Sequence, residues 1–220
     1  MTRIVGISGS PRQGNTRILL EQALNGANSV QGVETRLLEL RNLNIKPCMG
    51  CFGCSNDRPL PERPCPAHGD DMELVYSELA LTHGLILATP VYYGGVSGLL
   101  KNFMDRTEPL SRYGRTRYRS ALKNVVGGAV AVGANRNGGQ ETAIQAIHHY
   151  FLIQDMIVVG TSTEGLPGCY LGAGATTYPD KGRVVDAVKG DTLAMDAARA
   201  LGRRVAEVAV MIRAARAGAS

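Results

Sequence analysis

The chain of 220 residues is 44% hydrophobic and 20% charged, contains 27 glycines and carries a formal net charge of +5. This composition excludes a disordered chain and is typical of an α/β protein with many tight turns. Lysine and arginine are dispersed apart from the stretches 112–119 and 199–216, and because no recognition motif accompanies them they do not indicate a nucleic-acid partner.

Strand and helix patterns alternate from the first residues onward. Apolar patterns predict strands at 2–8, 33–40, 84–89, 125–132 and 157–160, the second with the polar residues of a sheet edge. Helical spacing predicts helices at 15–29, 70–81, 96–104, 140–153 and 193–212. A strand pattern so close to Met1 leaves no room for a signal peptide, and no apolar stretch is long enough to span a membrane. We therefore expect a cytoplasmic protein with no membrane partner.

Alternating strands and helices predict one α/β domain over residues 1–220, with a doubly wound, five-stranded parallel sheet and helices on both faces. In the common strand order 2-1-3-4-5 the ligand crevice lies beyond the carboxyl ends of strands one and three. The loops at 8–16 and 89–95 open there, and the loop at 133–139 is their neighbour. The long connection 161–190 is expected to be functional or to make contacts. The basic stretch 108–123 is expected to be a lid or an intersubunit segment.

The first loop, Gly6 to Thr16, has the character of a phosphate cradle. It joins a strand to a helix start, where free amides and the helix dipole favour an anion. A Walker A loop is disfavoured because Asn15 stands in place of its lysine, and the dinucleotide fingerprint lacks its second glycine because Ser8 occupies that position. The loop that remains offers amides and hydroxyls for one terminal phosphate, which suits a mononucleotide such as FMN. The alternative is an ordinary turn in which Asn15 or Thr16 merely caps the helix.

Four of the five cysteines lie within one short stretch, at Cys48, Cys51, Cys54 and Cys65. Disulfides are disfavoured in a reducing compartment, and zinc sites more often use two separated pairs. Three cysteines at Cys-x-x-Cys spacing and a fourth followed by proline are similar to ferredoxin ligation of iron–sulfur clusters. Zinc, a redox-switch set of thiols and inert cysteines remain alternatives, with His68 as a substitute ligand. Cys169 stands alone in the late connection.

Three motifs together resemble the NAD(P)H-dependent FMN reductase superfamily. They are Gly-Ser-Pro-Arg-x-Gly-Asn-Thr at 9–16, Thr-Pro-Val-Tyr-Tyr-Gly at 89–94 and Gly-Ala-Asn-Arg-Asn-Gly-Gly-Gln-Glu at 133–141. The cysteine motif after the second strand is similar to that of the iron–sulfur flavoproteins within this superfamily. The stretch before Cys65 is longer than the spacing usual in that family, which leaves the fourth ligand open.

The resemblance implies a flavodoxin-like fold and assigns residues to each cofactor. The FMN phosphate would contact Ser8, Ser10, Arg12, Gln13, Asn15 and Thr16. The flavin ring would lie against Pro90, Val91, Tyr92, Tyr93, Gly94 and Gly95, and would be closed on its other side by Asn135, Arg136, Gly138 and Gly139. A [4Fe-4S] cluster would be held by Cys48, Cys51, Cys54 and Cys65. One of the two tyrosines is equally well explained as a core ring.

The expected activity is electron transfer between FMN and the cluster in a homodimer or homotetramer. NAD(P)H or a ferredoxin-like protein would be the donor, and either a small molecule or a protein the acceptor. No side chain is expected to act as a catalytic acid or base, because the flavin carries the chemistry. The alternatives are a cluster-free NAD(P)H-dependent FMN or quinone reductase, and a redox-sensing or electron-carrier module.

Overall fold

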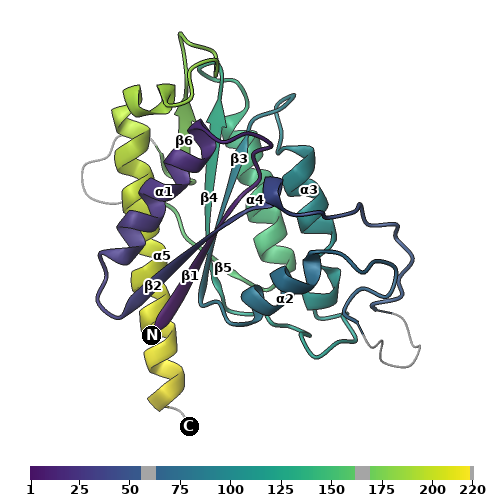
Figure 1. The fold of residues 1–220 in the computed structure, drawn as a ribbon. Coiled ribbons are helices and arrows are strands. Elements are labelled where there is room, and N and C mark those ends of the chain that lie inside the picture. Colours follow the sequence, from purple (N-terminus) through teal and green to yellow (C-terminus); the bar gives the residue numbers. More distant parts are fainter. Residues whose placement is uncertain (56–62, 162–168, 219–220) are drawn as a thin grey trace.

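The computed structural model describes residues 1–55, 63–161 and 169–218. A parallel sheet runs through its centre in the order β2-β1-β3-β4-β5, with β6 also paired to β4 (Figure 1). The strands are β1 (Thr2–Ser8), β2 (Val33–Glu39), β3 (Gly84–Pro90), β4 (Val126–Gly133), β5 (Ile157–Val158) and β6 (Ala173–Thr176). The predicted flavodoxin-like, doubly wound order is confirmed.

The edge of the sheet beside β4 differs from the prediction. In place of one strand at 157–160, the two-residue β5 pairs with the start of β4, at Val126 and Gly127, and β6 pairs with its end, from Val130 to Gly133. The described sheet thus has six strands, and β6 lies inside the stretch expected to be a connection. Its sequence Ala-Gly-Ala-Thr lacks the β-branched pattern of a strand. Ala173 and Ala175 are buried in the core that α1 and α5 cover, while Gly174 faces Gln140 and Ile144 of α4.

Helices cover both faces of the sheet (Figure 1). Helices α1 (Asn15–Asn28) and α5 (Thr192–Gly218) pack on one face, and α2 (Met72–Ala80), α3 (Gly98–Asp105) and α4 (Gln140–Ile153) on the other. Short helical turns follow as η1 (Leu40–Asn42), η2 (Glu108–Leu110) and η3 (Ala187–Gly190). Apolar residues of β1, β3 and β4 point to both faces and build two cores. No helix in the described part of the chain is long and apolar enough to cross a membrane.

The carboxyl ends of the inner strands meet at one edge of the sheet. Ser8 of β1 pairs with Ala88 of β3, and the end of β3 is in register with the end of β4. The loop after β1 is tied to the loop after β3 through Ser97, whose hydroxyl donates to the Gly9 carbonyl at 2.6 Å. The Ser97 amide donates to the Thr89 hydroxyl at 2.9 Å. The loops that leave this edge are therefore held close together.

Candidate functional site

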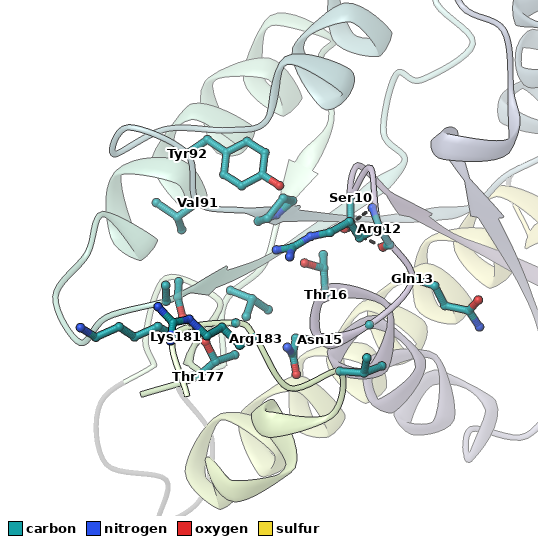
Figure 2. Close-up of a pocket in the computed structure, with 17 residues that line it drawn as sticks. Ser10, Arg12, Gln13, Asn15, Thr16, Val91, Tyr92, Thr177, Lys181 and Arg183 are labelled. Atoms are coloured by element: carbon teal, nitrogen blue, oxygen red, sulfur yellow. Dashed lines mark hydrogen bonds between the residues drawn. The ribbon is translucent and has the colours of Figure 1, made fainter. Parts of the chain in front are cut away.

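A pocket of about 150 Å³ lies at this edge, where four separate segments converge (Figure 2). Three of them are the predicted loops after β1, β3 and β4. The fourth is the segment 177–185 after β6. It is joined to β4 by the Thr177 amide, which donates to the Gly133 carbonyl at 2.9 Å. The pocket is thus placed at the point where the strand order reverses, as the fold predicts.

The start of α1 forms one wall of the pocket. Its N-cap is Gly14 and no side chain caps the helix, so the alternative in which Asn15 or Thr16 merely caps it is wrong. Within the described residues, the amides of Gly14, Asn15 and Thr16 donate to no acceptor. Free amides and the positive end of the helix dipole both favour an anion at this position.

Among the residues that the structure describes, three cationic side chains line the same pocket and no carboxylate does. Arg12 comes from the first loop, whereas Lys181 and Arg183 come from the fourth segment (Figure 2). None of the three forms an ion pair within the part of the chain that the structure describes. The Ser10 hydroxyl fixes the loop around Arg12 by donating to the Arg12 carbonyl at 2.8 Å and accepting its amide at 3.1 Å. The residues present therefore fit a phosphate group.

The side chains predicted to bind phosphate differ in what they can contribute. Ser10, Arg12, Gln13 and Thr16 line the pocket, although the Gln13 side chain points away from it (Figure 2). Ser8 is buried and lies outside the pocket. The Asn15 side chain is engaged elsewhere: its Nδ2 donates to the Val184 carbonyl at 2.8 Å and its Oδ1 accepts the Val188 amide at 2.9 Å. Asn15 thus anchors the fourth segment to the start of α1.

The segment predicted to face the flavin ring is a tight turn. The amides of Tyr92 and Gly95 each donate to the other residue's carbonyl at 3.0 Å, and both Tyr93 and Gly94 have positive φ. Pro90, Val91 and Tyr92 line the pocket, while Tyr93 projects fully into solvent. Tyr92 is 40% exposed, so neither ring belongs to the core and the core-ring interpretation is wrong.

The loop after β4 packs directly on this turn. A Cβ atom on Gly139 would lie 2.6 Å from the Cα of Gly94, so the two backbones touch. Buried Gln140 shapes the loop, since its Nε2 donates to the Asn135 carbonyl at 2.7 Å and its Oε1 accepts the Gly138 amide at 2.8 Å. Asn135 and Gly138 are exposed, and Arg136 and Gly139 line a neighbouring open hollow. The two predicted flavin loops therefore meet.

The cysteine segment follows the carboxyl end of β2. Its two ends, at Lys46 and Asp70, are held together at what we call its base. Buried Arg106, at the end of α3, donates to both carboxylate oxygens of Asp70, at 2.7 and 3.0 Å, and to the Lys46 carbonyl at 2.7 Å. Asp70 also accepts the Lys46 amide, and His68 lies 3.0 Å from the Pro47 carbonyl. Burial disfavours the charged form of Asp70, but the hydrogen bonds from Arg106 and the backbone lower its pKa to about 2.

The four thiols lie on the loop that this base closes. Cys48 and Cys51 are exposed, and Cys54 and Cys65 are half-buried. Burial raises the pKa of the Cys54 thiol to about 11, and the nearby Glu108, Cys65 and Cys48 add to the rise. Over residues 1–55, 63–161 and 169–218 no three His, Cys, Asp or Glu side chains are gathered closely enough to hold a metal as they stand. The fit to a cluster rests on the four-thiol donor set of this loop.

Sequence reasoning missed Lys181, Arg183 and Arg106. The first two follow β6, some 170 positions after the loop they face, and the only sequence signal was the unusual length of the connection. Arg106 ends a helix with no motif around it. Its partner Asp70 was predicted only to be the first residue of the helix at 70–81.

A doubly wound parallel sheet with a pocket at the point where the strand order reverses defines a flavodoxin-like protein. The family model described as NADPH-dependent FMN reductase matches residues 2–167. An iron–sulfur flavoprotein of Methanocaldococcus jannaschii is 43% identical over 96% of this chain and 99% of that protein. One of Methanosarcina thermophila is 39% identical over 74% of this chain and 79% of that protein.

Solved structures agree on the fold. A WrbA-like flavodoxin from Agrobacterium tumefaciens superposes with a TM-score of 0.59 at 20% identity, covering 96% of this chain and 99% of that one. The chain belongs to the NADPH-dependent FMN reductase family and, within it, to the iron–sulfur flavoproteins. It is a flavin-dependent oxidoreductase that uses FMN.

Proposed function

We propose that FMN binds with its phosphate in the pocket formed by Ser10, Arg12, Thr16, Lys181 and Arg183. The observation that carries this assignment is the combination of acceptor-free amides at the start of α1 with three cations and no carboxylate. A phosphate dianion matches both features. The flavin ring then lies beyond Pro90 and Val91, where the turn at 92–95 meets the loop at 135–139.

We further propose that Cys48, Cys51, Cys54 and Cys65 hold a [4Fe-4S] cluster. Four thiols on one loop closed at its base form the donor set that such a cluster needs. Binding would remove the proton that burial holds on Cys54. The names of the relatives from Methanocaldococcus jannaschii and Methanosarcina thermophila, both iron–sulfur flavoproteins, support this assignment.

When bound, FMN accepts a hydride and releases electrons singly or in pairs, and the cluster carries single electrons. The chain's own residues bind the two cofactors and orient them. Arg12 and the α1 amides fix the phosphate, and the contact between Gly94 and Gly139 fixes the two loops that frame the ring. The Arg106–Asp70 pair holds the cysteine loop at its base. NAD(P)H or a protein carrier supplies the electrons, and the working form is a homodimer or homotetramer.

Cysteine variants test the cluster separately from the flavin. We expect Cys51→Ala, prepared anaerobically, to lose its iron and sulfide and to retain FMN. Cys169→Ala is the matched control, because Cys169 is a half-buried thiol outside this loop, and it should keep both cofactors.

The same measurements distinguish the proposed function from the alternative, a cluster-free NAD(P)H-dependent quinone reductase. A relative from Acidithiobacillus ferrooxidans, 30% identical over 67% of this chain, is named a NAD(P)H dehydrogenase (quinone). Wild-type protein that contains FMN without iron and oxidises NAD(P)H steadily with a quinone would contradict the cluster assignment and favour that activity.

A further inference from the structure

We propose that Asn15 is a positioning residue for the FMN phosphate. It holds the fourth segment, 177–185, against the start of α1, so that the two together form one phosphate site. The proposal rests on the FMN assignment above and gives Asn15 a role other than contact with the phosphate. Through its side chain, two of the three cations of the pocket, Lys181 and Arg183, are kept in place.

The fourth segment makes few contacts of its own along its middle. Its beginning is tied to β4 by the Thr177 amide, and its end runs into η3, where Val188 is fully buried in the core that α1 and α5 cover. Between these points Val184 is 46% exposed and Val185 62% exposed. Other hydrogen bonds there are local, such as the one that the Lys181 amide donates to the Thr177 carbonyl at 3.1 Å. A stretch with so little buried surface opens easily unless another part of the chain holds it.

Asn15 provides this attachment. Its Nδ2 donates to the Val184 carbonyl at 2.8 Å and its Oδ1 accepts the Val188 amide at 2.9 Å. Within the described part of the chain, these are the only hydrogen bonds that join residues 178–188 to anything outside 176–191. An amide side chain suits this position because it offers a donor to a carbonyl and an acceptor to an N–H group. Asparagine is therefore matched to the backbone of the fourth segment.

Glycines allow the two segments to approach each other closely. A Cβ atom on Gly14 would lie 3.1 Å from the Val185 carbonyl oxygen, and one on Gly182 would lie 3.9 Å from Nη2 of Arg12. The fourth segment thus lies against the first loop at two places and brings its cations to the pocket beside the α1 amides (Figure 2).

Alanine at position 15 would remove the attachment without weakening α1. Asn15 is the first residue of this helix, and alanine has a higher helix propensity than asparagine. Any loss of FMN affinity in Asn15→Ala should then come from the displaced Lys181 and Arg183, and should depend on the presence of these two side chains.

A double-mutant cycle in anaerobic flavin titrations of the flavin-depleted protein tests this dependence. We expect Asn15→Ala to weaken FMN binding about tenfold and to leave the binding of riboflavin, which has no phosphate, within about twofold of wild type. In the background Lys181→Gln/Arg183→Gln, the same change should weaken FMN binding less than about twofold, because the cations that Asn15 positions are already gone. A general loss of structure would instead add in full.

Hydrogen exchange of the backbone amides at 178–187 provides a second measurement. In wild type, saturating FMN should slow this exchange and saturating riboflavin should not. In Asn15→Ala the segment should exchange as fast with FMN as without it, because the phosphate no longer acts on an attached segment.

The matched control is Asn102→Ala. Asn102 is also half-buried and its amide also donates to a backbone carbonyl, that of Ile45 at 3.2 Å, but it lies on α3 outside the pocket. It should leave FMN binding within about twofold of wild type.

Three results would each overturn the role of Asn15. They are FMN binding by Asn15→Ala within about twofold of wild type, equal losses for riboflavin and FMN, and fully additive losses in the cycle. Wild-type protein that binds riboflavin as tightly as FMN would overturn the phosphate assignment itself, and the role of Asn15 with it.

Discussion

Replacing Arg106 by methionine tests how the base of the cysteine loop is held. Arg106 and Asp70 are both 1% exposed, and the guanidinium makes three hydrogen bonds of 2.7 to 3.0 Å to Asp70 and Lys46. Removing one partner of a buried ion pair costs about 3–5 kcal/mol, because the other charge is left without compensation. The hydrogen bonds from Arg106 are one cause of the low pKa of Asp70, about 2, so the loss of these bonds is part of this cost.

Urea unfolding followed by circular dichroism at pH 7 measures the cost. The control on the same region of the chain is Lys101→Met, which breaks the exposed pair of Lys101 with Asp105 and should cost under about 1 kcal/mol. Asp70→Asn combined with Arg106→Met should recover part of the stability lost in Arg106→Met alone, since no buried charge then remains.

The stability lost in Arg106→Met should depend on pH, and the pKa of Asp70 sets the direction of this dependence. A carboxyl whose pKa is lowered by folding contributes stability above its unfolded value, near 4, and loses that contribution as the pH falls through its folded value of about 2. The difference in unfolding free energy between wild type and Arg106→Met should therefore shrink between about pH 4 and pH 2. A cost below about 1 kcal/mol at pH 7, or one that does not change with pH, would refute this explanation.

Two further predictions concern the phosphate pocket and the helix layer. Lys181→Gln and Arg183→Gln should each weaken FMN binding about tenfold and leave riboflavin binding unchanged in fluorescence titrations, and equal losses for both flavins would contradict a phosphate contact. Gly202→Ala should destabilise the fold by about 1–3 kcal/mol in urea, because its methyl group would overlap the backbone of α1, whereas Gly98→Ala meets nothing within 4 Å and should be neutral or stabilising.

The local patterns in the sequence were sufficient to predict most of the fold. Apolar strands such as 84–90 and the helical spacing at 140–153 reflect burial against a sheet, which the sequence records directly. The strand at 173–176 was missed because three of its four residues are alanine or glycine, whose small size suits the packing of helices on both faces of the sheet. Such a requirement arises only from tertiary contact and leaves no periodic pattern.

The candidate site was predictable where it follows strand ends and not where distant segments meet. The loop at 9–16 can be recognised in the sequence by its glycine and hydroxyl residues, which directly follow a strand. Lys181 and Arg183 carry no such signal, because their role depends on β6 bringing them to the pocket. Asn15 fits the phosphate motif in sequence, yet its side chain is used to hold the fourth segment, a bond that only the fold reveals.

The most direct test of the account is the cofactor content of anaerobically purified protein. Flavin released from the protein, together with iron and acid-labile sulfide, should be measured per chain in one preparation. We predict about one FMN, about four iron and about four sulfide. Protein that contains no flavin and cannot be reconstituted with FMN would contradict the central claim.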